Sequence, residues 1–440
     1  MTMRSKITLG RFALSGWMAI TGLCADAASG DRPPGVPQFG LDVGYEMRAS
    51  DNVALRRGAE GVEDIVHSPF VDVSALIDNA RVDLDANYRW LGRYFQDGTF
   101  PDDNVVTGSG GVTVAVLPQR ITWDARYTRS QQLRNLQQPD NPLNQREFDI
   151  YETGVLLGLL PPGPTTASLS ARIQEQRSSL DFDRSQRVTT GLQLGRTVSS
   201  KTTLGLSADR LRVVFDEPFF PDYERLTGAV TFAYSGAALT LDGRVGYNEI
   251  SFDEAEDSNG GESLGLSATW RLTGSQQLRL SASRELTDQT PGLGVGQLGF
   301  GDFRDQGAFG RVFEQSRAGV TWRTSRGRWN LSATANVPRQ DFVEGGQSDL
   351  DRWRVGGNVG YRFTPKLSAD LSLRLNRNEF AGQDREDEQL FGNLRFNWNP
   401  GPRTRFSLGL SHRRADSQAA TFNFEETAAI LTLSRTVLPW

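Results

Sequence analysis

Arginines in the C-terminal part of the chain recur where every second residue is polar. A guanidinium is always charged, and its planar fork binds carboxylates and other planar anions through two hydrogen bonds. Seven of these residues are therefore candidates for contact with an anionic substrate: Arg317, Arg323, Arg354, Arg362, Arg374, Arg395 and Arg405. The alternative is a structural network in which Arg and Asp side chains of one polar face satisfy one another. The sequence leaves both interpretations open.

Residues suited to catalysis are scarce. The sequence has two histidines, His67 and His412, and acid–base or acyl-transfer chemistry usually depends on one. Ser411 and His412 are adjacent, so in a strand their side chains point to opposite faces and cannot act together. We find no phosphate-binding loop, metal-ligand cluster or catalytic triad, and we predict a non-enzymatic protein without a cofactor. A glycosidase with two catalytic carboxylates stays open, although no pair of acids stands out.

The N-terminus has the features of a secretory signal. Basic residues up to Arg11 precede an apolar stretch, 12–24, and small residues follow it. We predict cleavage after Ala27, which would remove the only cysteine and with it any disulfide or thiolate chemistry. A lipid-attachment signal at Cys24 is the alternative interpretation.

Charge and hydropathy exclude two classes of protein. The net charge is −5, and removal of residues 1–27 would leave about −7, so nucleic acid is a poor partner. No stretch approaches the roughly 20 apolar residues of a membrane-spanning helix. The mean hydropathy of −0.44 fits a protein whose strands present only alternate residues to lipid.

Alternation of apolar and polar residues is the strongest pattern in the chain. From Trp353 to Phe363 the odd positions are apolar or Gly, and the even positions are polar or Gly. The pattern resumes over 367–376, after a turn at 364–366. Because successive side chains of a strand point to opposite faces, each segment has one apolar and one polar face.

About twenty such segments of roughly ten to fifteen residues succeed one another, close to the length a tilted strand needs to cross a bilayer. Short and long connections alternate, as do the periplasmic turns and outer loops of bacterial barrels. We expect short connections at 235–236, 273–275, 324–327 and 399–402, and long ones at 49–64, 130–146, 216–223, 251–262, 286–310 and 336–349. A break in phase at Asp209-Arg210-Leu211-Arg212 indicates a bulge or a membrane-interface position.

Aromatic residues gather beside the short connections, where they would form a belt at the membrane interface: Trp322, Trp329, Tyr361, Phe363, Trp398 and Phe406. The alternative is that they cap the hairpins of a soluble protein. The chain ends on Leu438-Pro439-Trp440, which resembles the signal that the barrel-assembly machinery recognises, with Leu438 and Trp440 as its candidate residues.

These patterns predict an all-β fold, a transmembrane antiparallel up-and-down barrel of about 20 strands (18–22) in a bacterial outer membrane. Closure has a physical reason, because an open sheet edge in lipid would leave backbone groups unpaired. The predicted organisation is a signal peptide (1–27), a short periplasmic segment (28–38) and one barrel (39–440). A large soluble all-β protein is the alternative.

Three of the long connections suggest functional roles. Loop 251–262 is rich in acids, enough for a calcium site, although a solvated charged loop is the simpler interpretation: Asp253, Glu254, Glu256, Asp257 and Glu262. Loop 216–223 has aromatic residues that could stack on sugar rings. Loop 286–310 is long and Gly-rich enough to fold inward as a constriction.

The first strand and its turn carry a resemblance to a known family. Residues 40–45 run into 49–56, with the turn at Asp51-Asn52, and a hairpin ends at Trp90. This opening resembles the EpsL-type, porin-like outer-membrane β-barrels encoded with exopolysaccharide biosynthesis loci, in which a Tyr strand precedes an Asp-Asn turn and a nearby Arg. Asp and Asn also favour turns in any protein. The resemblance implies a role in the synthesis or export of an extracellular polysaccharide.

Three functions remain in view. A polysaccharide-exporting conduit would contact outer-membrane lipid, the polysaccharide and periplasmic export components, and it would have a basic interior. A general diffusion or nutrient-uptake porin would pass small solutes without selecting polymers. A closed structural or adhesive barrel would act through its outer loops.

Overall fold

The computed structural model describes residues 36–134, 138–179, 184–216, 220–253, 258–288, 312–343, 349–381, 385–418 and 422–438. These residues form one twenty-stranded antiparallel sheet that closes on itself through its first and last strands. The predicted barrel is thereby confirmed, at the middle of the expected range of strand number. The predicted signal peptide, 1–27, and all but the last residues of the segment 28–38 lie outside the described residues, as does Trp440, and they stay predictions.

The strands have 13 to 17 residues each. In chain order they are β1 Gln38–Ser50, β2 Asp64–Asp78, β3 Val82–Phe95, β4 Asp103–Leu117, β5 Ile121–Leu133, β6 Gln145–Gly158, β7 Thr165–Ser178, β8 Ser185–Ser199, β9 Thr202–Phe215, β10 Tyr223–Ser235, β11 Leu239–Phe252, β12 Ser258–Thr273, β13 Gln276–Asp288, β14 Val312–Arg326, β15 Trp329–Phe342, β16 Leu350–Thr364, β17 Leu367–Phe380, β18 Arg385–Gly401, β19 Thr404–Ser417 and β20 Phe424–Leu438. Two short 3-10 helices, η1 Gly58–Glu60 and η2 Pro142–Asn144, lie in the loops after β1 and β5.

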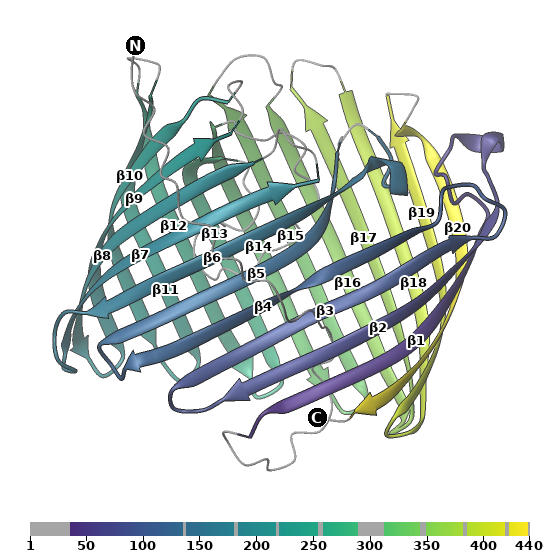
Figure 1. The fold of residues 1–440 in the computed structure, drawn as a ribbon, viewed down its shortest axis with the longest axis horizontal. Coiled ribbons are helices and arrows are strands. Elements are labelled where there is room, and N and C mark those ends of the chain that lie inside the picture. Colours follow the sequence, from purple (N-terminus) through teal and green to yellow (C-terminus); the bar gives the residue numbers. More distant parts are fainter. Residues whose placement is uncertain are drawn as a thin grey trace.

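Each strand pairs with its neighbours in the sequence, and the strands run steeply tilted around the barrel (Figure 1). The short turns gather at the lower end of that view, and the loops that carry η1 and η2 lie at the upper end. We refer to these as the turn end and the loop end. Among the described residues, no helix has the length and apolar character needed to span a membrane.

One face of the sheet is apolar and the other polar. Large aliphatic side chains such as Leu206, Val245 and Leu373 are 53–63% exposed, and they recur at alternate positions on strand after strand. The opposite face is concave, which brings side chains together across an intervening strand. Arg172 of β7 reaches Asp124 of β5 at 3.0 Å, over β6. The polar face is therefore the interior of the barrel, and the apolar face is the one suited to lipid.

The polarity of both faces changes near the loop end. In β9 the register continues without a shift through Asp209-Arg210-Leu211-Arg212. Arg210 points outward and binds Glu224 at 2.6 and 2.7 Å, while Leu211 and Val213 point inward and are buried. The phase break is thus not a bulge but a membrane-interface position, where outward residues become charged and inward residues become apolar.

This change explains why some predicted loops were too long. Residues 336–342, predicted as part of a loop, belong to β15, and Arg339 there pairs with Asp341 on the outward face. The backbone ladder continues beyond the apolar band, although the side-chain pattern that identifies it has ended. Inside, an apolar cluster closes over the loop-end halves of β9 to β14: Leu211, Val213, Phe215, Tyr223, Ile250, Phe252, Leu286 and Val312.

The aromatic residues near the turn end pack against one another across strands. The ring centroids of Trp329 and Tyr361 are 4.5 Å apart, and those of Trp398 and Phe406 are 5.3 Å apart. Trp329 and Trp398 are about half exposed on the outer face. This arrangement is the one expected of an interfacial belt, where an apolar ring meets lipid and its polar edge meets water.

A stack of three tyrosines explains why position 108 is occupied by a glycine. Tyr88, Tyr127 and Tyr151 stack across β3 to β6, with centroid separations of 5.7 and 4.9 Å. Gly108 of β4 lies beside Tyr88 with a φ of +152°, and a Cβ there would lie 2.1 Å from the carbonyl oxygen of Asn87. Neither that φ nor that space admits a side chain without a shift of the backbone.

Gly108→Ala should lower the free energy of unfolding by about 2 kcal/mol or more, because it adds both backbone strain and overlap with a neighbouring strand. Urea unfolding in detergent micelles, followed by far-ultraviolet circular dichroism, measures the loss. The matched control is Gly228→Ala, where nothing lies within 4 Å of the added Cβ. Equal midpoints for the two variants would contradict the prediction.

Candidate functional site

The strand register places all seven candidate arginines on the interior face. Arg354 lies opposite Asn336 and Asn376, and Arg374 lies opposite Gly356. The others lie opposite small or polar partners of the same face: Arg317 opposite Ser283, Arg323 opposite Ser332, Arg362 opposite Ser368, Arg395 opposite Asp370 and Arg405 opposite Ser434. They follow the inner surface of β14 and of β16 to β19.

We call the interior face of β14 to β19 the basic wall. In addition to the seven candidates it carries three arginines nearer the loop end: Arg352, Arg385 and Arg413. Its carboxylates, among the described residues, are Asp370 and Asp387. Amide and hydroxyl side chains fill the positions between the arginines: Ser332, Asn336, Asn358, Ser372, Asn376, Gln389, Asn393 and Ser411.

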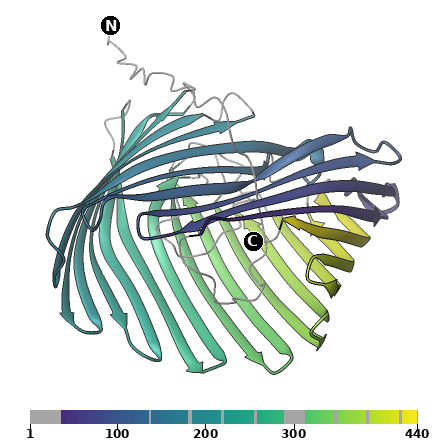
Figure 2. The same cartoon turned by 60° about the horizontal axis from the view of Figure 1, so that its bottom comes forward.

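The interior face of β1 to β5 has the opposite charge balance, and we call it the acidic wall. Its carboxylates are Asp42, Glu46, Asp64, Asp72, Asp78, Asp83, Asp85, Asp103 and Asp124, and its arginines are Arg48, Arg89, Arg93 and Arg126. Strands β1 to β5 and β14 to β17 face one another across the barrel in both views (Figures 1 and 2). Charges of opposite sign on facing walls create a field across the interior.

Ion pairs neutralise part of each wall. On the acidic wall, Arg89 binds Asp72 through two hydrogen bonds of 2.6 Å. On the basic wall, Arg385 holds Asp387, and the side chains of both are almost fully buried. The structural network considered from the sequence therefore exists at these positions.

The network does not extend to every candidate. In the part of the chain that the structure describes, Arg323, Arg362 and Arg395 form no ion pair. Asp370, the register partner of Arg395, accepts a hydrogen bond of 2.8 Å from Asn397 instead. These three guanidinium groups lie on the inner face with charge that no described carboxylate neutralises.

A buried cluster at the seam between the first and last strands was not foreseen from the sequence. Glu426 of β20 has a side chain that is 1% exposed, and its oxygens accept hydrogen bonds from Arg48 (2.5 Å), Ser50 (2.6 Å) and Arg413 (2.7 Å). Asp51 continues the seam by accepting a hydrogen bond of 2.7 Å from the backbone amide of Thr427. Nothing in the local sequence marks these residues, because they lie at opposite ends of the chain.

The three loop hypotheses have different outcomes. Tyr223, at the end of loop 216–223, is 1% exposed inside the apolar cluster, so it is not available to stack on a sugar. In loop 251–262, Asp253 pairs with Arg212 at 3.1 Å, while residues 254–257 lie outside the described residues. No group of three or more His, Cys, Asp or Glu suited to a metal occurs among the described residues. Residues 289–311, most of the predicted constriction, also lie outside them.

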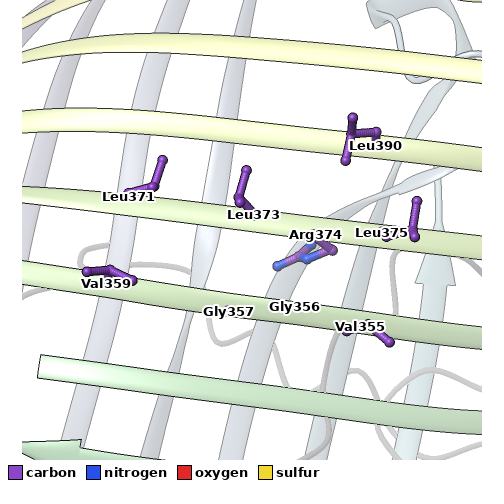
Figure 3. Close-up of a pocket in the computed structure, with 9 residues that line it drawn as sticks. All are labelled: Val355, Gly356, Gly357, Val359, Leu371, Leu373, Arg374, Leu375 and Leu390. Atoms are coloured by element: carbon purple, nitrogen blue, oxygen red, sulfur yellow. The ribbon is translucent and has the colours of Figure 1, made fainter.

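A shallow apolar groove of about 340 Å³ lies on β16 to β18. Figure 3 shows its lining, in which Val355, Val359, Leu371, Leu373 and Leu390 surround the gap left by Gly356 and Gly357. The valines and leucines belong to the outward set of residues, so the groove is part of the apolar surface that faces lipid. Arg374, which the register places on the interior face, is the polar side chain of this lining.

Comparison with known proteins supports a porin-like barrel. Residues 314–436, which include the whole of the basic wall except part of β14, match the family described as "Putative beta-barrel porin 2". No curated protein matches the sequence.

Solved structures share the fold at low sequence identity. The siderophore receptor PirA from Acinetobacter baumannii is 8% identical, with coverage of 92% of this chain and 81% of that chain and a TM-score of 0.52. The FrpB iron transporter from Neisseria meningitidis (F5-1 variant) is 9% identical over 91% and 83% of the two chains, with a TM-score of 0.49. OccK8 (OprE) from Pseudomonas aeruginosa is 10% identical, with coverage of 92% of this chain and 99% of that chain and a TM-score of 0.39. Over residues 314–436 the chain is therefore similar to a porin-like family, and it shares the barrel fold of the Acinetobacter siderophore receptor.

Proposed function

We propose that this protein is an outer-membrane conduit for acidic, hydroxyl-rich saccharides and serves the export of an extracellular polysaccharide. The observation that carries the proposal is the basic wall, where arginines alternate with amide and hydroxyl side chains and three of them, Arg323, Arg362 and Arg395, form no ion pair among the described residues. Guanidinium groups bind carboxylates through charge-assisted hydrogen bonds, and amides can donate to and accept from sugar hydroxyls. A row of such groups offers a polymer many equivalent weak sites, which lets it move instead of being held.

The facing acidic wall adds to the selectivity. A saccharide whose carboxylates line one side would be attracted to the basic wall and repelled from β1 to β5. The field would therefore orient the saccharide polymer along the barrel. A neutral solute would feel neither force. The link with export, as opposed to uptake, rests on the resemblance of the Asp51-Asn52 region to barrels encoded with exopolysaccharide loci.

Neutralising the basic wall should abolish the preference for acidic saccharides. The test is ion conductance of the refolded protein in a planar bilayer, with trigalacturonate or maltotriose as blocker. We expect trigalacturonate to block at least tenfold more tightly than maltotriose, since one hydrogen bond to a charged group contributes about 1.5–3 kcal/mol. In the quadruple variant Arg354→Gln, Arg362→Gln, Arg374→Gln and Arg395→Gln, the two blockers should act alike.

The matched control removes the same charge from the outer face: Arg210→Gln, Arg212→Gln, Arg339→Gln and Arg414→Gln, all at exposed ion pairs. It should keep the preference for trigalacturonate. A folded wild-type barrel without conductance would overturn the conduit and favour a closed structural or adhesive barrel. Equal block by both sugars in the wild type would favour a general diffusion porin.

A further inference from the structure

Three outer loops border an open pocket at the loop end of the acidic wall. The pocket has a volume of about 490 Å³ and lies between the loops after β1, β3 and β5, with Leu55, Arg56, Arg57, Glu60, Phe100, Pro139, Asn141 and Leu143 in its lining. That volume is within the usual range for small-ligand sites. None of the candidate residues identified from the sequence lies there.

The loop after β1 is held in one conformation by a single amide. Asn52, which is 3% exposed, donates to the carbonyl oxygens of Arg56 (2.7 Å) and Glu425 (2.8 Å) and accepts from the backbone amide of Arg56 (3.0 Å). Leu55 has a φ of +53° although it is not glycine, and it is 2% exposed. A bulky residue adopts that conformation only where its surroundings impose it, and such strain is concentrated at binding sites.

Apolar packing fixes the neighbouring loop against this one. Ala54 and Phe100 belong to a buried cluster with Val66 and Phe95, and the rings of Phe95 and Phe100 meet edge to face at 5.4 Å. The loop after β5 is ordered by Asn141, whose side chain accepts from the amides of Leu143 and Asn144 and so caps η2. The walls of the pocket are thus formed before any ligand arrives, which lowers the entropic cost of binding.

The chemistry of the pocket combines two cations with an apolar surface. Arg56 and Arg57 are exposed, and among the described residues neither side chain has a hydrogen bond or an ion pair. Glu60 is the single carboxylate of the lining. Leu143 is 63% exposed and supplies the apolar surface of the lining. A ligand with an anionic group next to an apolar ring face would pair with the two arginines and also cover the leucine.

We infer that this pocket is an external recognition site for an acidic sugar unit, whose carboxylate is bound by Arg56 and Arg57 and whose ring packs against Leu143. The inference rests on the proposed function, since it assigns to the outer mouth the same class of saccharide as the basic wall. The site lies outside the barrel interior, so it would bind the polymer where it leaves the barrel, or an extracellular polymer at the cell surface.

The test is isothermal titration of the full-length barrel in detergent micelles with trigalacturonate, maltotriose and inorganic phosphate. The double variant Arg56→Gln and Arg57→Gln should bind trigalacturonate at least tenfold more weakly, and the wild type should bind maltotriose at least tenfold more weakly than trigalacturonate. Arg326→Gln with Arg328→Gln, at the turn end, is the matched control and should bind as the wild type does. Circular dichroism confirms that each variant is folded.

The outcomes separate this inference from the conduit. Unchanged binding in the Arg56/Arg57 variant would overturn the external site and leave the proposed conduit untouched. Phosphate that competes as strongly as the sugar would overturn the assignment to a saccharide, because an anion alone would then suffice. Lost binding with unchanged conductance and block from the turn-end side would support the site, and a barrel that binds at Arg56 and Arg57 without conducting would overturn the conduit alone.

Discussion

Replacing Glu426 with Ala should lower the free energy of unfolding by about 3–5 kcal/mol, because it leaves two half-buried arginines without the fully buried carboxylate that they share. The carboxylate is shared between Arg48 and Arg413, with Ser50 as a third donor. Since these residues join β1 to β20 and β19, their contacts close the barrel. We expect the seam to open at a lower urea concentration than the rest of the wall.

Urea unfolding in detergent micelles, followed by tryptophan fluorescence, measures this effect. Glu425→Ala is a matched control one residue away, since its side chain is 69% exposed. That change should cost less than about 0.5 kcal/mol, as for other exposed ion pairs. Glu426→Gln keeps the hydrogen-bonding oxygen and removes the charge, so it should fall between the two. Similar midpoints for Glu426→Ala and Glu425→Ala would refute the role of the seam cluster.

Replacing Asn52 with Ala should release the loop after β1 while the barrel stays folded. The change removes three hydrogen bonds that Asn52 makes with part-buried backbone groups, at a local cost of up to about 1–3 kcal/mol for each group left unsatisfied. The freed segment contains Arg56 and Arg57, which are trypsin sites. We expect cleavage after these residues to accelerate at least tenfold, as judged by mass spectrometry of the fragments.

Asn79→Ala provides the comparison, because Asn79 accepts hydrogen bonds from the amides of Arg81 and Val82 in an exposed turn at the opposite end. Cleavage at Arg56 and Arg57 should not change in that variant. The Asn52→Ala protein should also bind trigalacturonate more weakly, since the pocket loses one wall. Unaltered cleavage at Arg56 and Arg57 would show that the loop is held by its apolar contacts instead.

The alternation of residue types was sufficient to identify the barrel and to assign its faces. A strand has a period of two, so each residue from Trp353 to Phe363 could be given a side without knowledge of its neighbours. By the same rule the seven arginines were assigned to the polar face of their strands. The aromatic residues beside the turns followed from composition, and the structure brings them into contact.

The errors arose where this local rule fails. At the loop end the outward face becomes charged and the inward face apolar, so the strand over 336–342 was taken for a loop and Tyr223 for an exposed aromatic residue. Both errors concern residues beyond the edge of the apolar band. The position of that edge along the chain cannot be identified from any single residue.

The sequence alone determined the architecture, the polar face and the arginines on it, because each follows from side-chain alternation within a few residues. The tertiary structure decided what those residues meet: the basic wall facing an acidic wall, Glu426 joined to Arg48 across a separation of 378 residues, and three distant loops around Arg56 and Arg57. Closure of the sheet creates these contacts, since it fixes which strands lie next to each other and which face one another. The alternation of residue types carries no information about which strands are neighbours or about which strands face one another.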